Sequence, residues 1–517
     1  MLCNKLFFPV LVVLSLQALD YVESSRILAF FPAPVKSHLI IHTAITNALA
    51  ERGHQLTVVT TVPLIKTNPR YRHILLDGCS IPKDYFSEKI NEAQPFYRQF
   101  ISLTEFINDC SNVTLQHPKM RKLMAEERFD LVILGYFFNE LHLGLGAHFK
   151  CPVVVSFMVQ PVRLINHFVG NPLEGAYVPN LLSAYEQPMN FWQRLKNFLI
   201  NEAFEPIMMR LFMTNQQKAF YDYNFPPEKY PSLEEMKKNV SLVLTNHHFS
   251  QGPIRPNVPA LIEIGGIQIK EKSDPLPEDI KSIMDKAKNG IVYFSFGSNI
   301  QGDVLDRSKA KIMFDVLSKL PFTILWKWGK TDLPGQAPNV IYKTWLPQDD
   351  VLAHPNVKLF VTHGGQGSVV ESLYHGVPMV GVPLFGEQHA NMVNVEKKGY
   401  GRMVEFTTMT EENFDRAVND VLTDGKYRQN VQTFAKLYKD RPMSAKETAV
   451  YWVEYVLRHR GAPHMQSPAV HLNKFQLMSL DVVGFLGVII YLVIKFIKFF
   501  VVFVYSKFVR KLKNKKE

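Results

Sequence analysis

The feature that most restricts the fold of this chain is an alternation, present in both halves, of short apolar runs with segments of helical periodicity. The runs in the first half are 26–31, 55–61, 130–134 and 152–157, and those in the second half are 291–296, 322–326, 340–342, 358–362 and 379–382. Runs of this length that are apolar almost throughout are typical of strands in a parallel sheet with helices on both faces. The alternation therefore predicts α/β folding as two Rossmann-like, doubly wound domains. At 517 residues the chain is also too long for a single core.

A segment rich in Pro and Gly separates the two halves. The predicted organisation is a first domain at 25–250, a linker at 251–277, a second domain at 278–440, and a helix with a pre-membrane segment at 441–476. Residues 166–233 are rich in aromatic residues and Met, with helical spacing in places. This region has two interpretations at this point: ordinary core packing, or an apolar wall for a lipophilic ligand.

Apolar segments of different kinds lie near the two ends. Lys5 precedes an apolar run that is short for a membrane span, and small residues follow, so residues 1–24 are predicted to be a secretory signal peptide. Residues 477–505 are predicted to form one transmembrane segment, in which Lys495 and Lys498 either snorkel or mark the cytosolic edge. A buried core helix is the alternative, but this segment leads into a basic tail at 506–517.

The formal net charge of +11 is concentrated at the C-terminus, because residues 495–517 alone contribute +7. The charge predicts a topology with a cytosolic tail and lumenal domains, a single-pass type I arrangement, and does not indicate nucleic-acid binding. Lys513 and Lys515 resemble a retrieval signal for the endoplasmic reticulum membrane. A plain basic flank to the membrane segment is the alternative.

Two sequons and three cysteines bear on a lumenal location. Asn112 and Asn239 each begin an Asn-X-Ser/Thr sequon and are predicted glycosylation acceptors if the chain enters the lumen. Beyond the signal segment, Cys79, Cys110 and Cys151 are widely spaced and odd in number. They show no disulfide framework and no zinc pattern.

The densest set of polar and glycine residues lies in the second half. It includes F-V-T-H-G-G-Q-G-S and P-L-F-G-E-Q, and its polar members follow the ends of predicted strands: Ser298, Trp345, Gln348, His363, Glu387 and Gln388. Ligands of open parallel sheets bind beyond the carboxyl ends of the strands, so these residues are predicted to share one site. His363-Gly364-Gly365 opens a predicted helix that reaches about His375, and the N–H groups at its start suit a diphosphate.

Several common cofactor motifs do not occur at this site. The dinucleotide pattern G-x-G-x-x-G is absent, which weighs against NAD, and so is a Walker lysine loop. No D-x-D occurs, so a metal-bridged diphosphate is not predicted. We therefore expect no bound cofactor and no metal.

The block from Trp345 to Gln388 resembles the signature of the UDP-glycosyltransferases, and arthropod members most. The resemblance covers most of the chain and is strongest over 290–400. It implies two domains of GT-B type facing a cleft, a UDP-sugar donor on the second and a small lipophilic acceptor on the first. The implied roles are uracil stacking for Trp345, nucleotide binding for Gln348, phosphate contact for His363, Ser368 and Arg255, ribose contact for Glu371, and sugar contact for Glu387 and Gln388.

Two positions depart from the family pattern. Gly367 stands where many members have Asn, and Glu387 stands where the sugar-contacting acid is usually Asp. Both changes bear on which sugar binds. The similarity to arthropod members favours glucose, with glucuronic acid as the alternative.

The resemblance places the catalytic base at His38, just past the first predicted strand. A neutral imidazole with a pKa near 7 can take the proton of an acceptor hydroxyl as its oxygen attacks C1 of the sugar. His42 lies one turn further on. A zinc site built on this pair is an alternative with no third ligand evident, and a helix-capping histidine without chemistry is another.

The acid that would orient this base is missing. Family members often carry Asp or Glu where this chain has Gly135. Asp130 lies at the wrong end of the strand and is predicted to be structural. Glu140, the nearest downstream acid, is the candidate partner of His38.

These expectations combine into a membrane-anchored transferase that inverts the anomeric carbon and serves detoxification or metabolite conjugation. The alternative from another class is a catalytically impaired binder of UDP-sugar or small apolar molecules, suggested by Gly135. A nucleotide-sugar epimerase of similar architecture fits the signal and anchor poorly. A homo-oligomer is left open.

Overall fold

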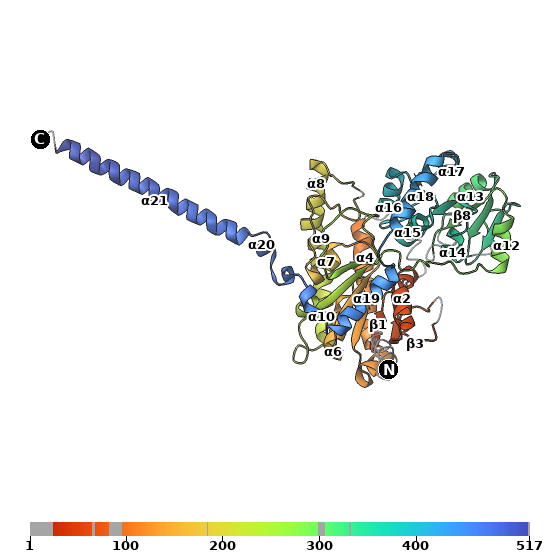
Figure 1. Cartoon of the computed structure of the whole chain (residues 1–517), viewed down its shortest axis with the longest axis horizontal. Coiled ribbons are helices and arrows are strands. Elements are labelled where there is room, and N and C mark those ends of the chain that lie inside the picture. The colour runs from red at the N-terminus through yellow and green to blue at the C-terminus, as the bar shows by residue number, and fades with distance from the viewer. Residues whose placement is uncertain are drawn as a thin grey trace, which may run out of the picture. The chain divides into compact units, whose positions relative to one another are not determined.

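The computed structural model describes residues 24–64, 68–81, 96–183, 185–297, 305–329 and 332–514. The chain divides into two compact units, Met1–Gln466 and Ser467–Glu517, and each is described by itself (Figure 1). Most of the predicted signal peptide and Ser298 lie outside the described residues.

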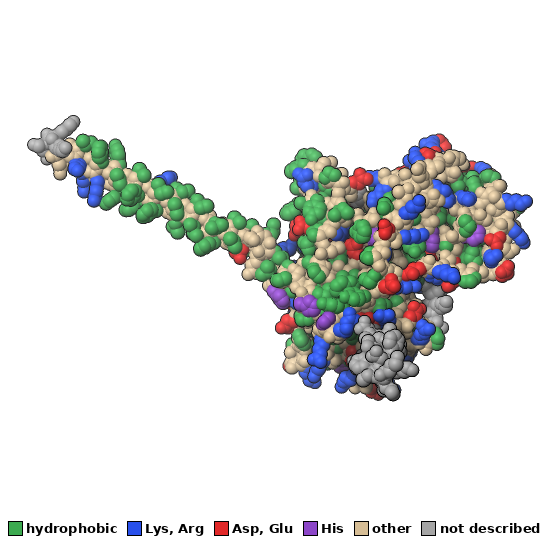
Figure 2. Space-filling view, in the orientation of Figure 1, with side chains coloured by type: hydrophobic (Ala, Val, Ile, Leu, Met, Phe, Trp, Pro, Cys, Tyr) green, Lys and Arg blue, Asp and Glu red, His purple; other side chains and the backbone are tan. Residues whose placement is uncertain are grey.

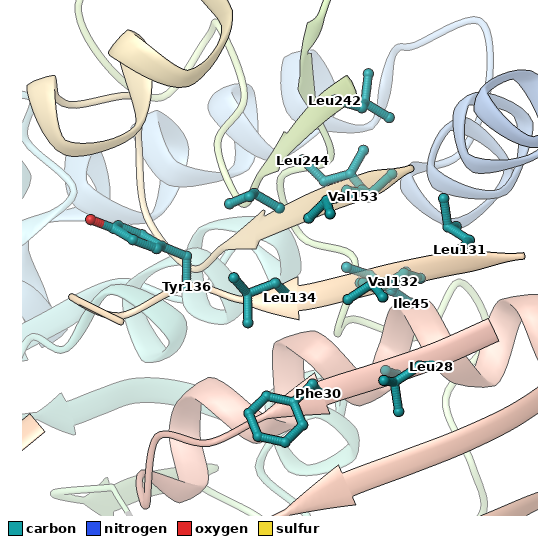
Figure 3. Close-up of a cluster of buried hydrophobic side chains, with 14 of the residues drawn as sticks. Leu28, Phe30, Ile45, Leu131, Val132, Leu134, Tyr136, Val153, Leu242 and Leu244 are labelled. Atoms are coloured by element: carbon teal, nitrogen blue, oxygen red, sulfur yellow. The ribbon is translucent and has the colours of Figure 1, made fainter. Parts of the chain in front are cut away.

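The first sheet of the larger unit has seven parallel strands in the order β3-β2-β1-β4-β5-β6-β7. Their bounds are β1 (Arg26–Phe31), β2 (Gln55–Thr60), β3 (Tyr71–Leu75), β4 (Leu131–Gly135), β5 (Val153–Phe157), β6 (Val240–Thr245) and β7 (Leu261–Glu263). All residues of β4 and β5 are buried, as expected for strands covered on both faces. Figure 3 shows part of this core, where Leu28 of β1 lies opposite Val132 of β4, and Phe30 opposite Leu134.

Helices of the first half include a long, nearly continuous run. The connecting helices are α2 (Lys36–Glu51), α4 (Phe96–Gln116), α5 (Pro118–Glu126), η1 (Glu140–Leu143), α6 (Gly144–Phe149), α7 (Arg163–Val169) and α11 (Leu233–Lys238). The run consists of α8 (Phe191–Phe198), η2 (Leu199–Phe204), α9 (Glu205–Met209), η3 (Arg210–Thr214) and α10 (Asn215–Asn224). Ile200, Phe204 and Met208 on this run line a large cavity, whereas Phe191 and Trp192 are exposed. The aromatic and Met-rich region thus forms a cavity wall and also part of the surface.

The second sheet has six parallel strands in the order β10-β9-β8-β11-β12-β13. Their bounds are β8 (Ile291–Ser295), β9 (Thr323–Lys327), β10 (Val340–Lys343), β11 (Val357–Thr362), β12 (Met379–Gly381) and β13 (Gly401–Met403). The helices are α12 (Glu278–Lys286), α13 (Arg307–Leu317), α14 (Gln348–Leu352), α15 (Gln366–His375), α16 (Gln388–Lys397), α17 (Glu411–Thr423) and α18 (Gly425–Lys439). Two parallel sheets with helices between their strands confirm the predicted α/β class.

Four strands were not predicted: β3, β6, β7 and β13. β7 lies inside the segment predicted to be a linker and pairs with β6. Strands of three residues, such as β7 and β13, are too short to show a periodic pattern. The neighbouring strand, and not the local sequence, makes such segments extended.

Helix α19 (Ala445–Arg458) packs against the first sheet although it follows the second in sequence. Its residues Ala449 and Val453 belong to the buried cluster of the first half. Arg52 of the first half donates from Nε to Glu454 Oε1 of α19 at 3.1 Å. The end of the larger unit therefore covers the N-terminal helix α2.

A disulfide joins Cys79 to Cys110, with their Cα atoms 5.3 Å apart, while Cys151 is free. The sequence showed no disulfide framework, so this pairing corrects that expectation. Two cysteines separated by 31 residues carry no local signal of pairing. Their proximity depends on how α4 packs.

The smaller unit contains short helical turns, η5 (Pro468–His471) and α20 (Lys474–Leu477), and the long helix α21 (Leu480–Lys513). Within the described residues, Leu480–Leu512 is the one helix long and apolar enough to cross a membrane, with a mean hydropathy of 2.5. Figure 2 shows hydrophobic side chains along most of it. At 34 residues it is about 51 Å long, more than the ~30 Å of a bilayer core. This helix fits a single-pass anchor whose end extends beyond the hydrocarbon.

Candidate active site

One cavity of about 1350 Å³ brings together residues from the carboxyl ends of strands in both sheets. From the first half it is lined by Ser37, His38, Tyr136 and Phe137, and from the second by Trp345, Gln348, His363, Gly365, Gly367, Ser368, Glu371, Glu387 and Gln388. His38 and the predicted residues of the second half therefore share one space. Gly364 lies buried next to it, within the same loop.

Trp345 follows β10 and is 49% exposed at the edge of this cavity. Lys327, the last residue of β9, places Nζ 4.4 Å from the centre of the Trp345 ring and donates to the carbonyl oxygen of Gly297 at 2.9 Å. Burial, reinforced by Lys36, lowers the pKa of Lys327 to about 8. The sequence interpretation missed Lys327, although its position at a strand end is the signal that selected the other residues.

Gln348 connects the polar groups below Trp345. Its Nε2 donates to Glu371 Oε2 at 2.7 Å and to Ser368 Oγ at 2.9 Å, and its Oε1 accepts from the Tyr293 hydroxyl at 3.2 Å. Burial and the nearby Asp349 raise the pKa of Glu371 to about 8. This cluster holds a carboxyl group in a fixed position, half-buried and facing the cavity.

His363 follows β11 and is enclosed by glycines. A Cβ on Gly297 would lie 2.9 Å from His363 Cε1, and a Cβ on Gly365 would lie 2.6 Å from Nε2. Burial lowers the pKa of His363 to about 4, so the ring is neutral near pH 7. Its Nδ1 is buried and has no hydrogen-bond partner among the residues that the structure describes. Next to this ring, α15 begins, and its first N–H groups have no acceptor within the helix.

Glu387 and Gln388 lie at the start of α16 and face the same cavity. Gln388 Oε1 accepts from the backbone N–H groups of Leu384 and Phe385, at 2.9 and 3.2 Å. Its position is therefore set by the preceding loop. Burial raises the pKa of Glu387.

His38 lies in the first turn of α2 at the other side of the cavity. Its ring meets the Phe137 ring edge-on, with centroids 4.7 Å apart. Its Nδ1 is buried, with no hydrogen-bond partner in the described ranges of the chain. Burial lowers its pKa to about 4, well below the value near 7 that was expected. The helix begins after Val35 with no side-chain cap, so His38 does not cap it. Among the described residues no three His, Cys, Asp or Glu side chains form a metal-binding group.

Glu140 is not positioned to orient His38, contrary to the expectation. Its Oε2 lies 2.5 Å from Lys237 Nζ, and its Oε1 accepts from the Tyr136 hydroxyl at 3.3 Å and lies 3.7 Å from His167 Nε2. Within the described part of the chain it makes no hydrogen bond or ion pair with His38. A buried carboxylate is held by the cation that compensates its desolvation, and here that cation is Lys237.

Arg255 also lies elsewhere than expected. Its guanidinium donates to the carbonyl oxygen of Pro161 and, at 3.2 Å, to Gln160 Oε1. It is not among the residues that line the cavity. These two acceptors in the loop after β5 fix the position of the Arg255 side chain.

The two predicted glycosylation acceptors differ in environment. Asn112 lies within α4, where its Oδ1 accepts from Asn224 Nδ2 at 3.0 Å, and the hydroxyl of Thr114 in the same sequon is buried. Asn239 is exposed at the end of α11. The geometry favours Asn239 as the accessible acceptor.

Comparison with known proteins places this architecture in one family. The family model described as UDP-glucoronosyl and UDP-glucosyl transferase matches residues 28–516. The chain belongs to this family. It is therefore a UDP-glycosyltransferase, an enzyme that transfers a sugar from a UDP-sugar donor.

Relatives of this UDP-glycosyltransferase occur in arthropods and mammals. It is 34% identical to UDP-glycosyltransferase UGT5 of Dactylopius coccus, over 90% of this chain and 89% of that protein. It is 32% identical to UDP-glucuronosyltransferase 1A6 of Homo sapiens, over 90% and 88%. A solved UDP-glucosyltransferase from Polygonum tinctorium, with 15% identity, has a TM-score of 0.57 over 84% of this chain and 99% of its own. This chain and the solved Polygonum tinctorium enzyme share the GT-B fold.

In this UDP-glycosyltransferase, the end of β4 has no room for the expected acid. A Cβ on Gly135 would lie 2.8 Å from Phe31 Cδ1 and 3.0 Å from both Cδ2 and Nε2 of His42. His42 is 2% exposed. The space beside Gly135 is therefore filled by another imidazole.

Proposed function

We propose that this enzyme transfers glucose from UDP-glucose to a hydroxyl of a small lipophilic acceptor, with inversion at C1. The observation that carries the proposal is the shared cavity, in which His38 of the first half and Trp345, Gln348, Glu371 and Glu387 of the second lie around one space. UDP-glucuronic acid is the alternative donor.

The donor would bind along the carboxyl edge of the second sheet. Trp345 stacks on uracil, and Glu371, held by Gln348, accepts the ribose hydroxyls. The diphosphate lies at the N-terminus of α15, where N–H groups and the helix dipole meet the charge that develops on UDP. His363, neutral, donates a hydrogen bond to phosphate, as does Ser368. Glu387 and Gln388 hold the sugar hydroxyls.

The acceptor would bind against the apolar wall of the first half. Phe106, Phe137, Phe157, Met158 and Met208 line this part of the cavity. His38 takes the proton from the acceptor hydroxyl while its oxygen attacks C1 from the face opposite UDP. One displacement inverts the anomeric carbon.

The cellular setting that fits this activity is the endoplasmic reticulum membrane. A cleaved signal peptide at 1–24, the anchor helix and the lysines at the end of the tail support a type I orientation with the cavity in the lumen. Conjugation of lipophilic compounds, including foreign ones, is the role we propose. Retention of an epitope-tagged full chain in endoplasmic reticulum membranes, protected from added protease except at its tail, tests this orientation.

The activity is tested by incubating the full-length enzyme with UDP-glucose and a panel of phenols, and measuring both UDP release and the glycoside. We expect a product of inverted configuration with UDP-glucose and slower turnover with UDP-glucuronate. His38→Ala should lower turnover by roughly 10²–10⁴ and leave UDP-glucose affinity nearly unchanged. Equal turnover in this variant would remove His38 from the base role.

A second candidate function is a binder of UDP-sugar without turnover. The missing acid at Gly135 and the low pKa of His38 favour it, because a weaker base accelerates transfer less. Tight UDP-glucose binding without release of UDP across the panel would establish this alternative.

A further inference from the structure

A second histidine lies on the same helix as the proposed base. His42 follows His38 by four residues on α2 and is buried. Its Nδ1 lies 2.8 Å from Ser156 Oγ, the next-to-last residue of β5. Its ring stacks on Phe31 with centroids 4.9 Å apart and planes at 22°. The ring is therefore fixed by packing on one side and by a hydrogen bond at one nitrogen.

The two imidazoles lie along the same strand end. His42 Nε2 is 3.0 Å from the point where a Cβ on Gly135 would lie. The His38 ring packs on Phe137, which follows Gly135 by two residues. Residues four apart on a helix have neighbouring side chains, with Cβ atoms about 5–6 Å apart. His38 Nδ1, the atom an acid would hold, is buried and has no hydrogen-bond partner within the described part of the chain.

We infer that His42, held by Ser156, is the positioning residue for His38 and occupies the place of the missing carboxylate. This inference rests on the proposed function. Ser156 Oγ accepts from His42 Nδ1–H, which leaves the lone pair of His42 at Nε2. His38 Nδ1, which makes no hydrogen bond among the described residues, donates its proton to that lone pair after a small rotation of the His38 side chain. This contact fixes the tautomer of His38 whose Nε2 is free to act as base.

The proton balance of the step follows from these tautomers. The acceptor O–H proton moves to His38 Nε2 as the new bond from oxygen to C1 forms and the bond from C1 to the UDP oxygen breaks. The charge on His38 is shared through Nδ1–H with the neutral His42. UDP leaves as an anion, and the imidazolium then loses its proton to solvent.

Two substitutions test the contact without emptying the core. His42→Phe keeps a ring against Phe31 and removes both nitrogens, and Ser156→Ala removes the acceptor that sets the tautomer. We expect kcat to fall roughly 10–100-fold in His42→Phe, at or below the lower end of the usual contribution of acid–base catalysis because the base itself remains, with KM for both substrates changed less than about twofold. His54→Phe, at a buried histidine outside the cavity, is the matched control and should keep kcat.

Rescue by a carboxylate separates a positioning role from a packing role. In a His42→Ala background, Gly135→Asp gains the space that the imidazole filled, and the Phe31 ring, whose Cδ1 would lie 2.8 Å from the added Cβ, can move into the same space. The double variant should restore kcat at least about tenfold. In the wild-type background the same Gly135→Asp change meets His42 and Phe31 and should lower activity. Loss of activity in His42→Ala without any recovery in the double variant would overturn the inference, as would a rise in KM alone.

A readout that needs no transfer keeps this inference distinct from the proposed function. The rate at which diethyl pyrocarbonate modifies His38 Nε2, followed by mass spectrometry of the peptide in the full-length protein, reports its tautomer and nucleophilicity. We expect slower modification in His42→Phe and Ser156→Ala. Absence of transfer by the wild-type enzyme refutes the proposed function, whereas unchanged modification of His38 in both variants refutes the role of His42.

Discussion

The affinity of this enzyme for UDP-glucose should rise with pH, because of the carboxyl group of Glu371. Its pKa is raised to about 8, chiefly by burial. A ribose diol donates two hydrogen bonds, which a carboxylate accepts and a protonated carboxyl group accepts poorly. Nucleotide binding therefore selects the carboxylate form. As pH falls below the raised pKa, the binding-competent fraction falls with it.

The magnitude follows from the pKa of about 8. At pH 7 about one molecule in eleven carries the carboxylate, so the apparent Kd is about 11-fold above its high-pH limit. At pH 6 the factor is about 100, and each pH unit corresponds to about 1.4 kcal/mol. Above pH 9 the apparent Kd should be nearly constant.

Titration calorimetry with UDP-glucose, whose diphosphate diester does not titrate over this range, measures the effect. Near pH 7 binding should release almost one proton, seen as a dependence of the enthalpy on the ionisation enthalpy of the buffer. Glu371→Gln is the matched control: it stays neutral, binds more weakly, and should lose the pH dependence. A wild-type Kd that is constant between about pH 6 and 9 would refute this account of the ribose site.

Three further predictions concern single positions. Trp345→Ala should weaken UDP-glucose binding by about 1–3 kcal/mol through lost stacking, measured by calorimetry, with no change in the exposed control Trp192→Ala. Gly367→Ala should increase the free energy of unfolding by up to about 1 kcal/mol and so raise the thermal unfolding midpoint, because position 367 is helical and an added Cβ would meet no atom within 4 Å. A lower midpoint would show that glycine is needed there. Glu205 lines the cavity, and burial raises its pKa. Glu205→Gln should lower kcat/KM for tyramine more than for 4-ethylphenol, measured as UDP release, and equal losses would exclude an acceptor contact.

The pH dependence of the kinetic constants also distinguishes the contribution of His38 from that of Glu371, which the sequence alone could not do. The sequence predicted a base at His38 with a pKa near 7, but burial places that pKa at about 4. The base is then unprotonated throughout the physiological range. An increase in kcat/KM for UDP-glucose between about pH 6 and 8 would come from donor binding at Glu371, and kcat at saturating donor should stay level.

Residues that follow directly from chain order were the most predictable. Trp345, Gln348 and His363 come just after strands whose apolar runs are evident, and parallel strands end at one edge of a sheet. Lys327 obeys the same rule and was missed because the strand was predicted to end one residue earlier, at Trp326. Short strands such as β7 were missed because three residues cannot show a period.

Residues whose position depends on partners distant in sequence were predicted less well. Glu140 and Arg255 have side chains long enough to reach several possible partners. In the structure Glu140 pairs with Lys237, and Arg255 donates to Gln160. The pairing of Cys79 with Cys110 likewise depends on the packing of a helix. Sequence spacing supplies none of these contacts.

Gly135 shows how a correct observation from sequence can support opposite conclusions. The absence of an acid beside His38 favoured an impaired binder, because losing the orienting group of such a base can cost several orders of magnitude in rate. In the structure, His42 occupies the space that an acid at position 135 would need. Ser156 holds His42 through Nδ1, and Nε2 is the nitrogen beside Gly135. A neutral imidazole can set the tautomer of His38 but adds no negative charge, so it stabilises the imidazolium less than a carboxylate does. An active but slower transferase is therefore the physical expectation for this pair of residues, between the full dyad and the inert binder.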